Sequence, residues 1–428
     1  MYVIGIDIGT TSICGVVLDT DTGKAVKSRT ELSNAFIQTP NSWEKIQNTD
    51  RLISIACAIL DDFLREFTVC AIGLTGQMHG IVYVNAEGKA ISPLYTWQDG
   101  RGNQPYKDTT YAKFLGSNTG YGNVTDFYNR ENGLRPADAV SHCTIMDYLA
   151  MYLCGLKKPV IHSTNAASLG CFDLSGNAFF YDLDAAVSDT FQIAGEYKGI
   201  PVSLAIGDNQ ASVFSTLTNA DDLLINVGTG SQVSLISDLI RTGQDIESRP
   251  YFDGKYLVVG AALCGGRAYG ILKDFYKSFM EAAGASADDV YGVMGKLIQD
   301  TAASYSPLTV NTRFSGTRQN PALTGSITEI TAENFTPANL TLGVLEGMMA
   351  ELYEMYAQMG EKRLNLVGSG NGIRLNPVLV QIAERTFGGT LKIPAHTEEA
   401  AYGAALFALV ACGAAKDADD AQKLVCYQ

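Results

Sequence analysis

Charged residues and long apolar runs are both scarce in this chain. Of its 428 residues, 18% are charged and 46% are hydrophobic, and 45 acidic residues against 31 basic ones give a net charge of −14. Negative charge repels phosphate backbones and anionic lipid, so we expect neither a nucleic-acid partner nor a membrane partner. The most apolar late stretch, residues 400–415, is mostly alanine and too short to span a bilayer.

Cys-x-x-Cys pairs are absent as well. The nine cysteines are scattered and odd in number, which favours reduced thiols in a cytosolic protein over a disulfide framework. The start of the sequence, Met1 to Asp7, has neither the basic region nor the uncharged apolar run of a signal peptide. From these two features we expect a cytoplasmic location.

Two common ligand-binding signatures are missing too. No Gly-x-x-x-x-Gly-Lys-Ser/Thr loop occurs, which excludes a phosphate site built on that motif. His142, His162 and His396 show no metal-ligand spacing, and we interpret them as structural or surface residues.

The apolar material that is present exceeds what one core uses. Single cores stop growing at roughly 250–300 residues, so a chain of 428 residues with no long disordered tract predicts two domains. No low-complexity linker marks the boundary. We place it near residues 214–222, which gives an N-terminal domain of residues 1–215 and a C-terminal domain of residues 216–428.

One strand–turn–strand pattern occurs twice, about half a chain apart. Apolar runs flank a glycine turn at residues 7–11 and again at residues 227–231, which predicts two β-hairpins. Aligning Gly9 with Gly228 matches Ile-Asp-Ile-Gly-Thr-Thr-Ser with Ile-Asn-Val-Gly-Thr-Gly-Ser. This self-similarity indicates an internal duplication.

Helical segments alternate with short strands in both halves. The pattern predicts helices over residues 50–66 and 267–283 and strands over residues 71–75 and 364–367. This alternation is typical of an α/β protein with one mixed sheet, flanked by helices, in each half. The least periodic region, residues 100–135, is interpreted as an insertion near the active cleft.

A glycine turn between two strands can bind phosphate. It points successive backbone N–H groups into one concavity, and flanking hydroxyls add donors. One such turn alone is more often structural, but two at equivalent positions favour a grip on a nucleotide tail. Asp7 can also hold Mg²⁺ through water, since magnesium prefers a few carboxylates plus substrate phosphates. The phosphate-binding residues that we predict are Gly9, Thr10, Thr11, Ser12, Gly228, Thr229 and Gly230.

Several motifs together carry a resemblance to a known family. The paired turns resemble the phosphate loops of the actin, Hsp70 and hexokinase superfamily. Within it, the chain resembles the FGGY carbohydrate kinases from end to end, through residues 75–80 (Thr-Gly-Gln-Met-His-Gly), 97–101 (Trp-Gln-Asp-Gly-Arg), 207–210 (Gly-Asp-Asn-Gln), 314–318 (Phe-Ser-Gly-Thr-Arg) and 368–371 (Gly-Ser-Gly-Asn).

The resemblance implies a fold and two substrates. The fold would be two ribonuclease H-like (actin-like ATPase) domains, each a mixed sheet flanked by helices, with a cleft between them. The N-terminal domain would hold the sugar and the first phosphate loop, and the C-terminal domain the adenosine. ATP and Mg²⁺ would be required, and the other predicted ATP-binding residues are Gly265, Gly266, Gly370 and Asn371.

Asp208 is the candidate catalytic base. A sugar hydroxyl is a poor nucleophile, and a carboxylate within hydrogen-bond reach can orient it and take its proton. An Asp in a Gly-Asp-Asn turn is by itself more often a turn former, but the resemblance implies a base here, close to the metal that Asp7 also approaches. The substrate-binding residues that it implies are Gln77, Met78, His79, Trp97, Asp99 and Asn209.

The loop of residues 368–372 is open to a second interpretation, dinucleotide binding. Its glycine spacing is not Gly-x-Gly-x-x-Gly, and no strand-end acid follows at the expected distance, so we reject that interpretation. After the loop, Asn376 as cap, Pro377 in the first turn and Gly388 as terminator predict a helix. We expect this helix to wall the adenine pocket.

Within the family, the likeness is strongest to sedoheptulokinases, through residues 97–101, 143–148 and 165–170. The resemblance thus implies a kinase that phosphorylates the terminal hydroxyl of a ketose, with sedoheptulose favoured. A D-xylulose or L-ribulose kinase would share the catalytic residues. A non-enzymatic nucleotide switch of the actin or Hsp70 kind would need neither the sugar segment nor the base. A homodimer is one assembly compatible with the sequence.

Overall fold

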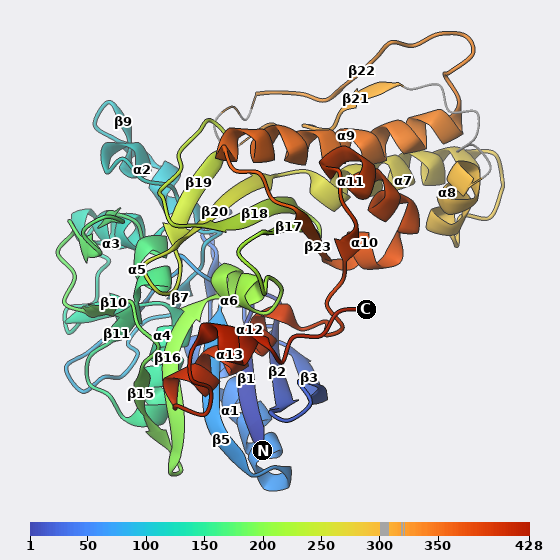
Figure 1. The fold of residues 1–428 in the computed structure, drawn as a ribbon. Coiled ribbons are helices and arrows are strands. Elements are labelled where there is room, and N and C mark those ends of the chain that lie inside the picture. Colours follow the sequence, from blue (N-terminus) through green and yellow to red (C-terminus); the bar gives the residue numbers. More distant parts are fainter. Residues whose placement is uncertain (300–307, 318–319, 321) are drawn as a thin grey trace. The chain divides into compact units, whose positions relative to one another are not determined.

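The computed structural model describes residues 1–299, 308–317, 320 and 322–428 (Figure 1). The chain forms two compact units. Unit 1 contains residues 1–218, 249–256 and 396–426, and unit 2 contains residues 219–248, 257–395 and 427–428. Arg318, the last residue of one family motif, lies outside the described residues.

Unit 1 is built around a mixed six-stranded sheet. Its strand order is β15-β16-β5-β1-β2-β3, with bounds β1 Tyr2–Ile8, β2 Ser12–Asp19, β3 Ala25–Leu32, β5 Val69–Gly76, β15 Ile193–Tyr197 and β16 Ile200–Gly207. Its principal helices are α1 Thr49–Glu66, α4 Ile145–Cys154, α5 Ser163–Ser168, α6 Asp208–Phe214, α12 Glu399–Ala411 and α13 Ala418–Gln422.

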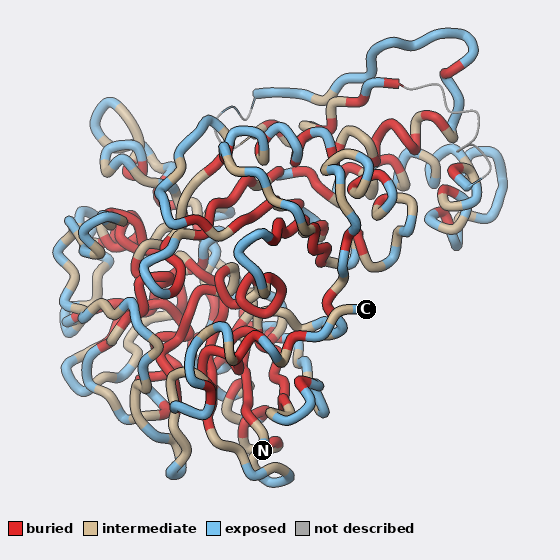
Figure 2. The backbone as a smooth tube through the Cα atoms, viewed as in Figure 1, coloured by how far each residue is buried: buried red, intermediate tan, exposed pale blue. Residues whose placement is uncertain are grey.

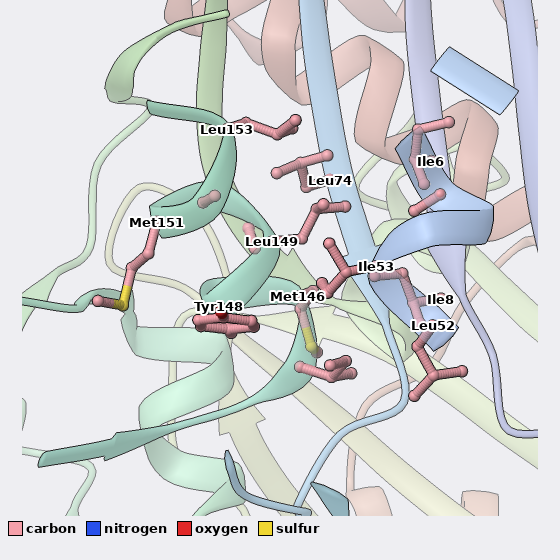
Figure 3. Packing of buried hydrophobic residues seen from close by; sticks show 14 of the residues in the cluster. Ile6, Ile8, Leu52, Ile53, Leu74, Met146, Tyr148, Leu149, Met151 and Leu153 are labelled. Carbon is pink, nitrogen blue, oxygen red and sulfur yellow. The ribbon is translucent and has the colours of Figure 1, made fainter. Parts of the chain in front are cut away.

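Both faces of this sheet are covered by helices. Leu52 and Ile53 of α1 and Leu149 of α4 pack with Ile6 and Leu74 of the sheet in one apolar cluster (Figure 3). Fully burying an Ile or Leu side chain stabilises a fold by roughly 1.5–3 kcal/mol. Burial on both faces explains why β1 reads as a continuous apolar run rather than an alternating one.

The other face of the sheet lies directly against the backbone of α12. A Cβ atom added to Gly5 would lie 1.8 Å from the carbonyl oxygen of Ala401, and one added to Gly73 would lie 1.9 Å from that of Ala404. Neither position can carry a side chain in this arrangement. Glycine in β1 and β5 therefore allows a helix from the far end of the sequence to complete unit 1.

Unit 2 also contains a six-stranded sheet, in which five strands correspond in order to five strands of unit 1. Its sheet has the order β19-β20-β18-β17-β23-β24, with bounds β17 Asp222–Val227, β18 Ser231–Ser237, β19 Ile246–Pro250, β20 Tyr256–Ala262, β23 Asn365–Ser369 and β24 Leu391–Lys392. Its helices are α7 Gly265–Ala282, α8 Val290–Gln299, α9 Pro337–Met359, α10 Asn371–Leu375 and α11 Pro377–Phe387. Residues 249–256, which comprise the end of β19, the following turn and the first residue of β20, are grouped with unit 1.

The two sheets share a pattern of strand directions. In unit 1 the β1–β2 hairpin is antiparallel, and β5 and then β16 continue the sheet in parallel. In unit 2 the β17–β18 hairpin is antiparallel, and β23 and β24 continue in parallel. The central strands of both sheets are buried (Figure 2). The predicted α/β class, with one mixed sheet per half, is confirmed.

The insertion over residues 100–135 has its own small structure. It contains the 3₁₀ helix η1 Gly100–Asn103, the short strands β8 Pro105–Tyr106 and β9 Thr109–Thr110, and the helices α2 Tyr111–Phe114 and α3 Gly122–Glu131. Aromatic rings pack it together, with Tyr111 in contact with Tyr106, Phe127 and Tyr128. Among the helices that the structure describes, none is both long and apolar enough to cross a membrane.

Candidate active site

Three neighbouring strands of unit 1 end at the same edge of the sheet. The parallel register pairs Asp7 of β1 with Thr75 of β5, and Thr75 with Ile206 of β16. The residues that follow these strands therefore lie next to one another. This edge carries the first glycine turn, the segment beginning at Gln77, and Asp208.

The first glycine turn, between β1 and β2, is tight, and side chains of two other segments form hydrogen bonds with its backbone. A Cβ atom on Gly9 would lie 2.8 Å from the carbonyl oxygen of Ser12. The carbonyl oxygen of Thr10 accepts hydrogen bonds from Gln47 Nε2 (2.7 Å) and Ser33 Oγ (3.0 Å). These bonds fix the turn between β1 and β2 in the position where phosphate contacts were predicted. Thr11 is exposed at its tip.

Asp208 is the first residue of α6, directly after β16. Burial raises the pKa of its carboxyl to about 6, although a backbone hydrogen bond from Asn209 and the positive charge of Arg249 oppose the shift. A general base works best when its pKa is near the working pH. Arg249 also donates a hydrogen bond of 3.2 Å to Asn209 Oδ1, so the amide next to the candidate base has a fixed orientation.

Asp7 is enclosed and lies among other negative charges. Burial, the charge of Asp208 and the charge of Glu398 raise its pKa to about 7. Within the described part of the chain, no group of three or more His, Cys, Asp and Glu side chains could hold a metal ion by itself. The site thus has excess negative charge without a complete set of protein ligands. This combination suits a Mg²⁺ ion, which is usually bound by one or two carboxylates together with substrate phosphates.

Gln77 and Met78 both point into the protein. Gln77 is 3% exposed, and its amide bonds to Gln47 Oε1 (2.9 Å) and to Thr10 Oγ1 (3.3 Å). Met78 is 5% exposed and belongs to the core of unit 1. Its Sδ would lie 2.9 Å from a Cβ atom on Gly207. Gln77 therefore contacts the first turn, and Met78 packs beneath the start of α6.

His79 has a strained backbone and a fixed ring. Its φ of 74° lies in the left-handed region, which costs energy for a non-glycine residue and is often a mark of functional sites. Its Nδ1 lies 2.8 Å from the carbonyl oxygen of Ser168, and its ring stacks on Tyr121 at 4.3 Å. A carbonyl can only accept, so Nδ1 carries the proton and Nε2 is the acceptor of the ring.

Trp97 and Asp99 differ sharply in exposure. Trp97 is 46% exposed, and its Nε1 donates a hydrogen bond of 3.0 Å to Thr10 Oγ1. Asp99 is fully buried. Its carboxylate accepts hydrogen bonds from the backbone N–H of Lys45 (2.9 Å) and from Nε of Arg101 (2.6 Å), among others. Asp99 thus orders the loop that presents Trp97.

The second turn lies in unit 2 and is braced by α7. Gly266 N–H donates to the carbonyl oxygen of Gly228 (3.1 Å), and Arg267 N–H donates to that of Thr229 (2.9 Å). Cβ atoms on Gly265 and Gly266 would lie 2.3 Å and 2.2 Å from atoms of the turn. This close packing of the helix N-terminus requires both glycines.

A pocket of about 1000 Å³ opens beside the second turn, entirely within unit 2. It is lined by Gly228, Thr229, Gly266 and Asn371, together with residues of α7, α8 and the start of α11. Gly370 has a φ of 80°, and a Cβ atom there would lie 2.5 Å from the carbonyl oxygen of Val227.

The predicted helix beside this pocket is confirmed. Asn376 Oδ1 accepts from Leu379 N–H, Pro377 occupies the first turn, and Gly388 ends α11 in the left-handed conformation. Pro377, Val378 and Leu379 line the pocket.

The sequence did not single out several residues that shape the site of unit 1. Glu398, the residue before α12, raises the pKa of Asp7 from a position almost 400 residues away. Arg249 reaches Asn209 from the end of β19. Gln47 and Ser168 hold the first turn and His79. Glu398, Arg249 and Gln47 lie in segments without a motif, and Ser168 lies in the family-like segment 165–170, which does not mark a role for it. Only packing identifies these four.

Known proteins match this chain over nearly its full length. The model of the N-terminal domain of the FGGY family of carbohydrate kinases matches residues 2–188, and that of the C-terminal domain matches residues 223–412. Sedoheptulokinase from Mus musculus is 29% identical over 469 residues, and that from Homo sapiens is 28% identical over 470, each covering 95% of this chain and 97% of its own.

A solved structure gives the same result for the fold. Xylulose kinase from Rhodospirillum rubrum, at 19% identity, superposes with a TM-score of 0.86 over 100% of this chain and 93% of its own. This likeness confirms the fold class that the sequence predicted.

Proposed function

The chain belongs to the FGGY family of carbohydrate kinases, and we propose that within this family it phosphorylates the terminal hydroxyl of a ketose, most readily sedoheptulose. Its substrates are then a sugar and ATP. The observation that carries this proposal is the convergence of Asp208, Asp7 and the Gln77–His79 segment at one edge of the sheet of unit 1. The homodimer and the cytoplasmic location stay predictions.

Asp208 is the general base in this proposal. The sugar's terminal hydroxyl donates to the Asp208 carboxylate, which takes its proton as the new phosphorus–oxygen bond forms. A pKa of about 6 leaves this carboxylate largely ionised at neutral pH and still basic enough to accept a proton. Asn209, held by Arg249 through its Oδ1, offers its Nδ2–H₂ group to a sugar oxygen.

The remainder of the sugar lies along His79 and Trp97. With Nδ1 of His79 donating to Ser168, Nε2 accepts a hydrogen bond from a sugar hydroxyl. The exposed indole of Trp97 gives an apolar wall. Asp99, whose oxygens are occupied by Lys45 and Arg101, contributes by ordering this loop rather than through its own free lone pairs.

The charges of unit 1 suit a Mg²⁺ ion, and the pocket of unit 2 suits the adenosine of ATP. A cation beside Asp7 would relieve the repulsion among Asp7, Asp208 and Glu398, and Asp7 and Asp208 are the groups that would hold it, directly or through water. When bound, the ion neutralises charge on the phosphates during transfer. The pocket beside Gly370 and Asn371 is the site proposed for the adenosine.

Sedoheptulose is favoured over other ketoses because the two sedoheptulokinases match over almost their whole length. D-Xylulose is the next candidate, since xylulose kinases match at 32–35% identity over about a quarter of the chain. The family membership favours both over a non-enzymatic nucleotide switch.

A substrate panel tests the proposal. ADP production is measured with sedoheptulose, D-xylulose, L-ribulose, gluconate and glycerol at equal concentrations. We expect the highest kcat/KM with sedoheptulose and transfer to its terminal hydroxyl, identified by NMR of the product. Better use of glycerol or gluconate than of any ketose would overturn the proposal, and ATP turnover independent of sugar would revive the switch.

A further inference from the structure

A closed ring of hydrogen bonds joins the exposed Trp97 to the first turn of unit 1. Trp97 Nε1 donates to Thr10 Oγ1 at 3.0 Å, and Thr10 Oγ1 donates to Gln77 Oε1 at 3.3 Å. Gln77 Nε2 then donates to Gln47 Oε1 at 2.9 Å, and Gln47 Nε2 returns to the carbonyl oxygen of Thr10 at 2.7 Å. Side chains from three other segments thus meet at Thr10.

The direction of every bond in this ring follows from the carbonyl oxygen of Thr10, which can only accept. Gln47 Nε2 therefore donates to it, and Gln47 Oε1 accepts from Gln77 Nε2. Gln77 Nε2 also donates, at 3.5 Å, to the carbonyl oxygen of Gly9, so Gln77 Oε1 is left to accept the hydrogen of the Thr10 hydroxyl. The Thr10 hydroxyl then has only lone pairs left for Trp97, whose indole nitrogen can only donate.

The two glutamines of this network are buried, and Trp97 is its exposed end. Gln47 and Gln77 are 0% and 3% exposed, whereas Trp97 is 46% exposed. A sugar packing against the indole would bury it and restrict it to the orientation that donates to Thr10. Ordering one end of a connected network lowers the entropy cost of ordering the other end.

We propose that Thr10 is a positioning residue that couples the sugar site to the first phosphate turn, so that bound ketose raises the affinity for ATP. This inference rests on the proposed function, in which Trp97 faces the sugar and the Gly9–Ser12 turn faces the phosphates. In this proposal the Thr10 hydroxyl forms hydrogen bonds with Trp97 and Gln77 and does not itself bind phosphate. Coupling between two ligands is reciprocal, so bound ATP raises the affinity for the sugar by the same factor.

Thr10→Val tests the coupling directly. Valine keeps the shape of threonine but can neither accept from Trp97 nor donate to Gln77. The turn itself should survive, because Gln47 and Ser33 still bond the backbone oxygen of residue 10. Thr10→Ser restores the hydroxyl, and Thr68→Val removes an exposed threonine hydroxyl at the opposite end of β5 as a matched control.

The measurement is the affinity for a non-hydrolysable ATP analogue with Mg²⁺, by calorimetry, with and without saturating sedoheptulose. We expect sedoheptulose to tighten binding at least about fivefold in the wild type, Thr10→Ser and Thr68→Val, within the usual range of coupling, and less than about twofold in Thr10→Val. The reverse factor is read from the fluorescence of Trp97 in a Trp43→Phe background, since the chain has 2 tryptophans.

Each outcome decides the matter. An unchanged coupling factor in Thr10→Val, or no coupling in the wild type, would overturn the inference. Should Thr10→Val fail to fold, Trp97→Phe keeps the aromatic wall and removes only the donor, and undiminished coupling there is equally fatal. The proposed function is tested separately, because wild-type protein that phosphorylates no ketose would refute it. If the wild type turns over a ketose normally and sedoheptulose still tightens ATP binding in Thr10→Val, only the role of Thr10 is refuted.

Discussion

Asp7 and Asp208 lie at the carboxyl ends of β1 and β16, the two strands that flank β5, and the negative charge of Asp208 raises the pKa of Asp7. Two carboxylates with raised pKa values at one edge of a sheet are costly to fold. Such a cost is tolerated where the groups have a task. The proposed division of labour gives proton transfer to Asp208 and the cation to Asp7, and it leads to separate predictions.

Asp208→Asn should lower kcat by roughly 10²–10⁴, the usual contribution of a general base. The KM for sugar should change little, because the proton moves only as the transition state forms and asparagine keeps the size and one hydrogen bond. Steady-state kinetics with the best ketose, with a circular dichroism melt to verify folding, provides the measurement. Near-normal turnover would remove Asp208 from the role of base.

Asp7→Asn should abolish Mg²⁺-dependent turnover while raising the melting temperature of the protein without metal. The enclosed carboxylate is destabilised by burial, by Asp208 and by Glu398, and the amide avoids that penalty. Asp21→Asn, at an exposed turn, is the matched control and should change neither quantity. Full activity in Asp7→Asn, or a melting temperature well below the wild type, would contradict this assignment.

Stability should depend on pH through Asp147, a buried carboxyl in α4. Thr144 Oγ1 donates to its Oδ2 (2.6 Å) and Asn165 Nδ2 to its Oδ1 (3.1 Å), yet burial raises its pKa from 3.8 to about 7. Because the folded state binds the proton more tightly, stability is lost as pH rises from about 3.8 to about 7 and then levels off. The full loss amounts to about 4 kcal/mol at most.

Asp147→Asn should remove this dependence. The difference in unfolding free energy between variant and wild type, from urea titrations at several pH values, should grow through that window and stay constant above it. Taking the difference cancels the buried His142 and His162, whose lowered pKa values act in the opposite sense at low pH. A flat difference would show that folding does not raise the pKa of Asp147.

Gly370→Ala should raise the KM for ATP with little effect on that for sugar. The new Cβ would lie 2.5 Å from the carbonyl oxygen of Val227, at a φ of 80°, beside the pocket of unit 2. Gly360→Ala is a matched control, since its φ of 71° imposes similar strain in open space at the end of α9. It should lower stability by about 1–2 kcal/mol and leave KM unchanged. Equal KM values in both variants would argue against adenosine at Gly370.

Sequence alone determined the parts of this protein whose causes are local. Hairpins at residues 7–11 and 227–231 follow from glycine between apolar runs, and α11 follows from Asn376, Pro377 and Gly388. Caps and turns depend on the backbone preferences and hydrogen bonds of a few consecutive residues, which a motif records. The family motifs, which mark Asp208 and His79, are short segments of the same kind.

Tertiary structure alone decided which distant groups meet those motifs. Glu398 reaches the surroundings of Asp7 because Gly5 and Gly73 let α12 pack on β1 and β5. The motif around Asp99 predicts a sugar ligand, but in the folded chain its carboxylate accepts hydrogen bonds from Arg101 and from the backbone N–H of Lys45. Long-range packing depends on the shape and burial of surfaces made from many segments, and no spacing within one segment encodes it.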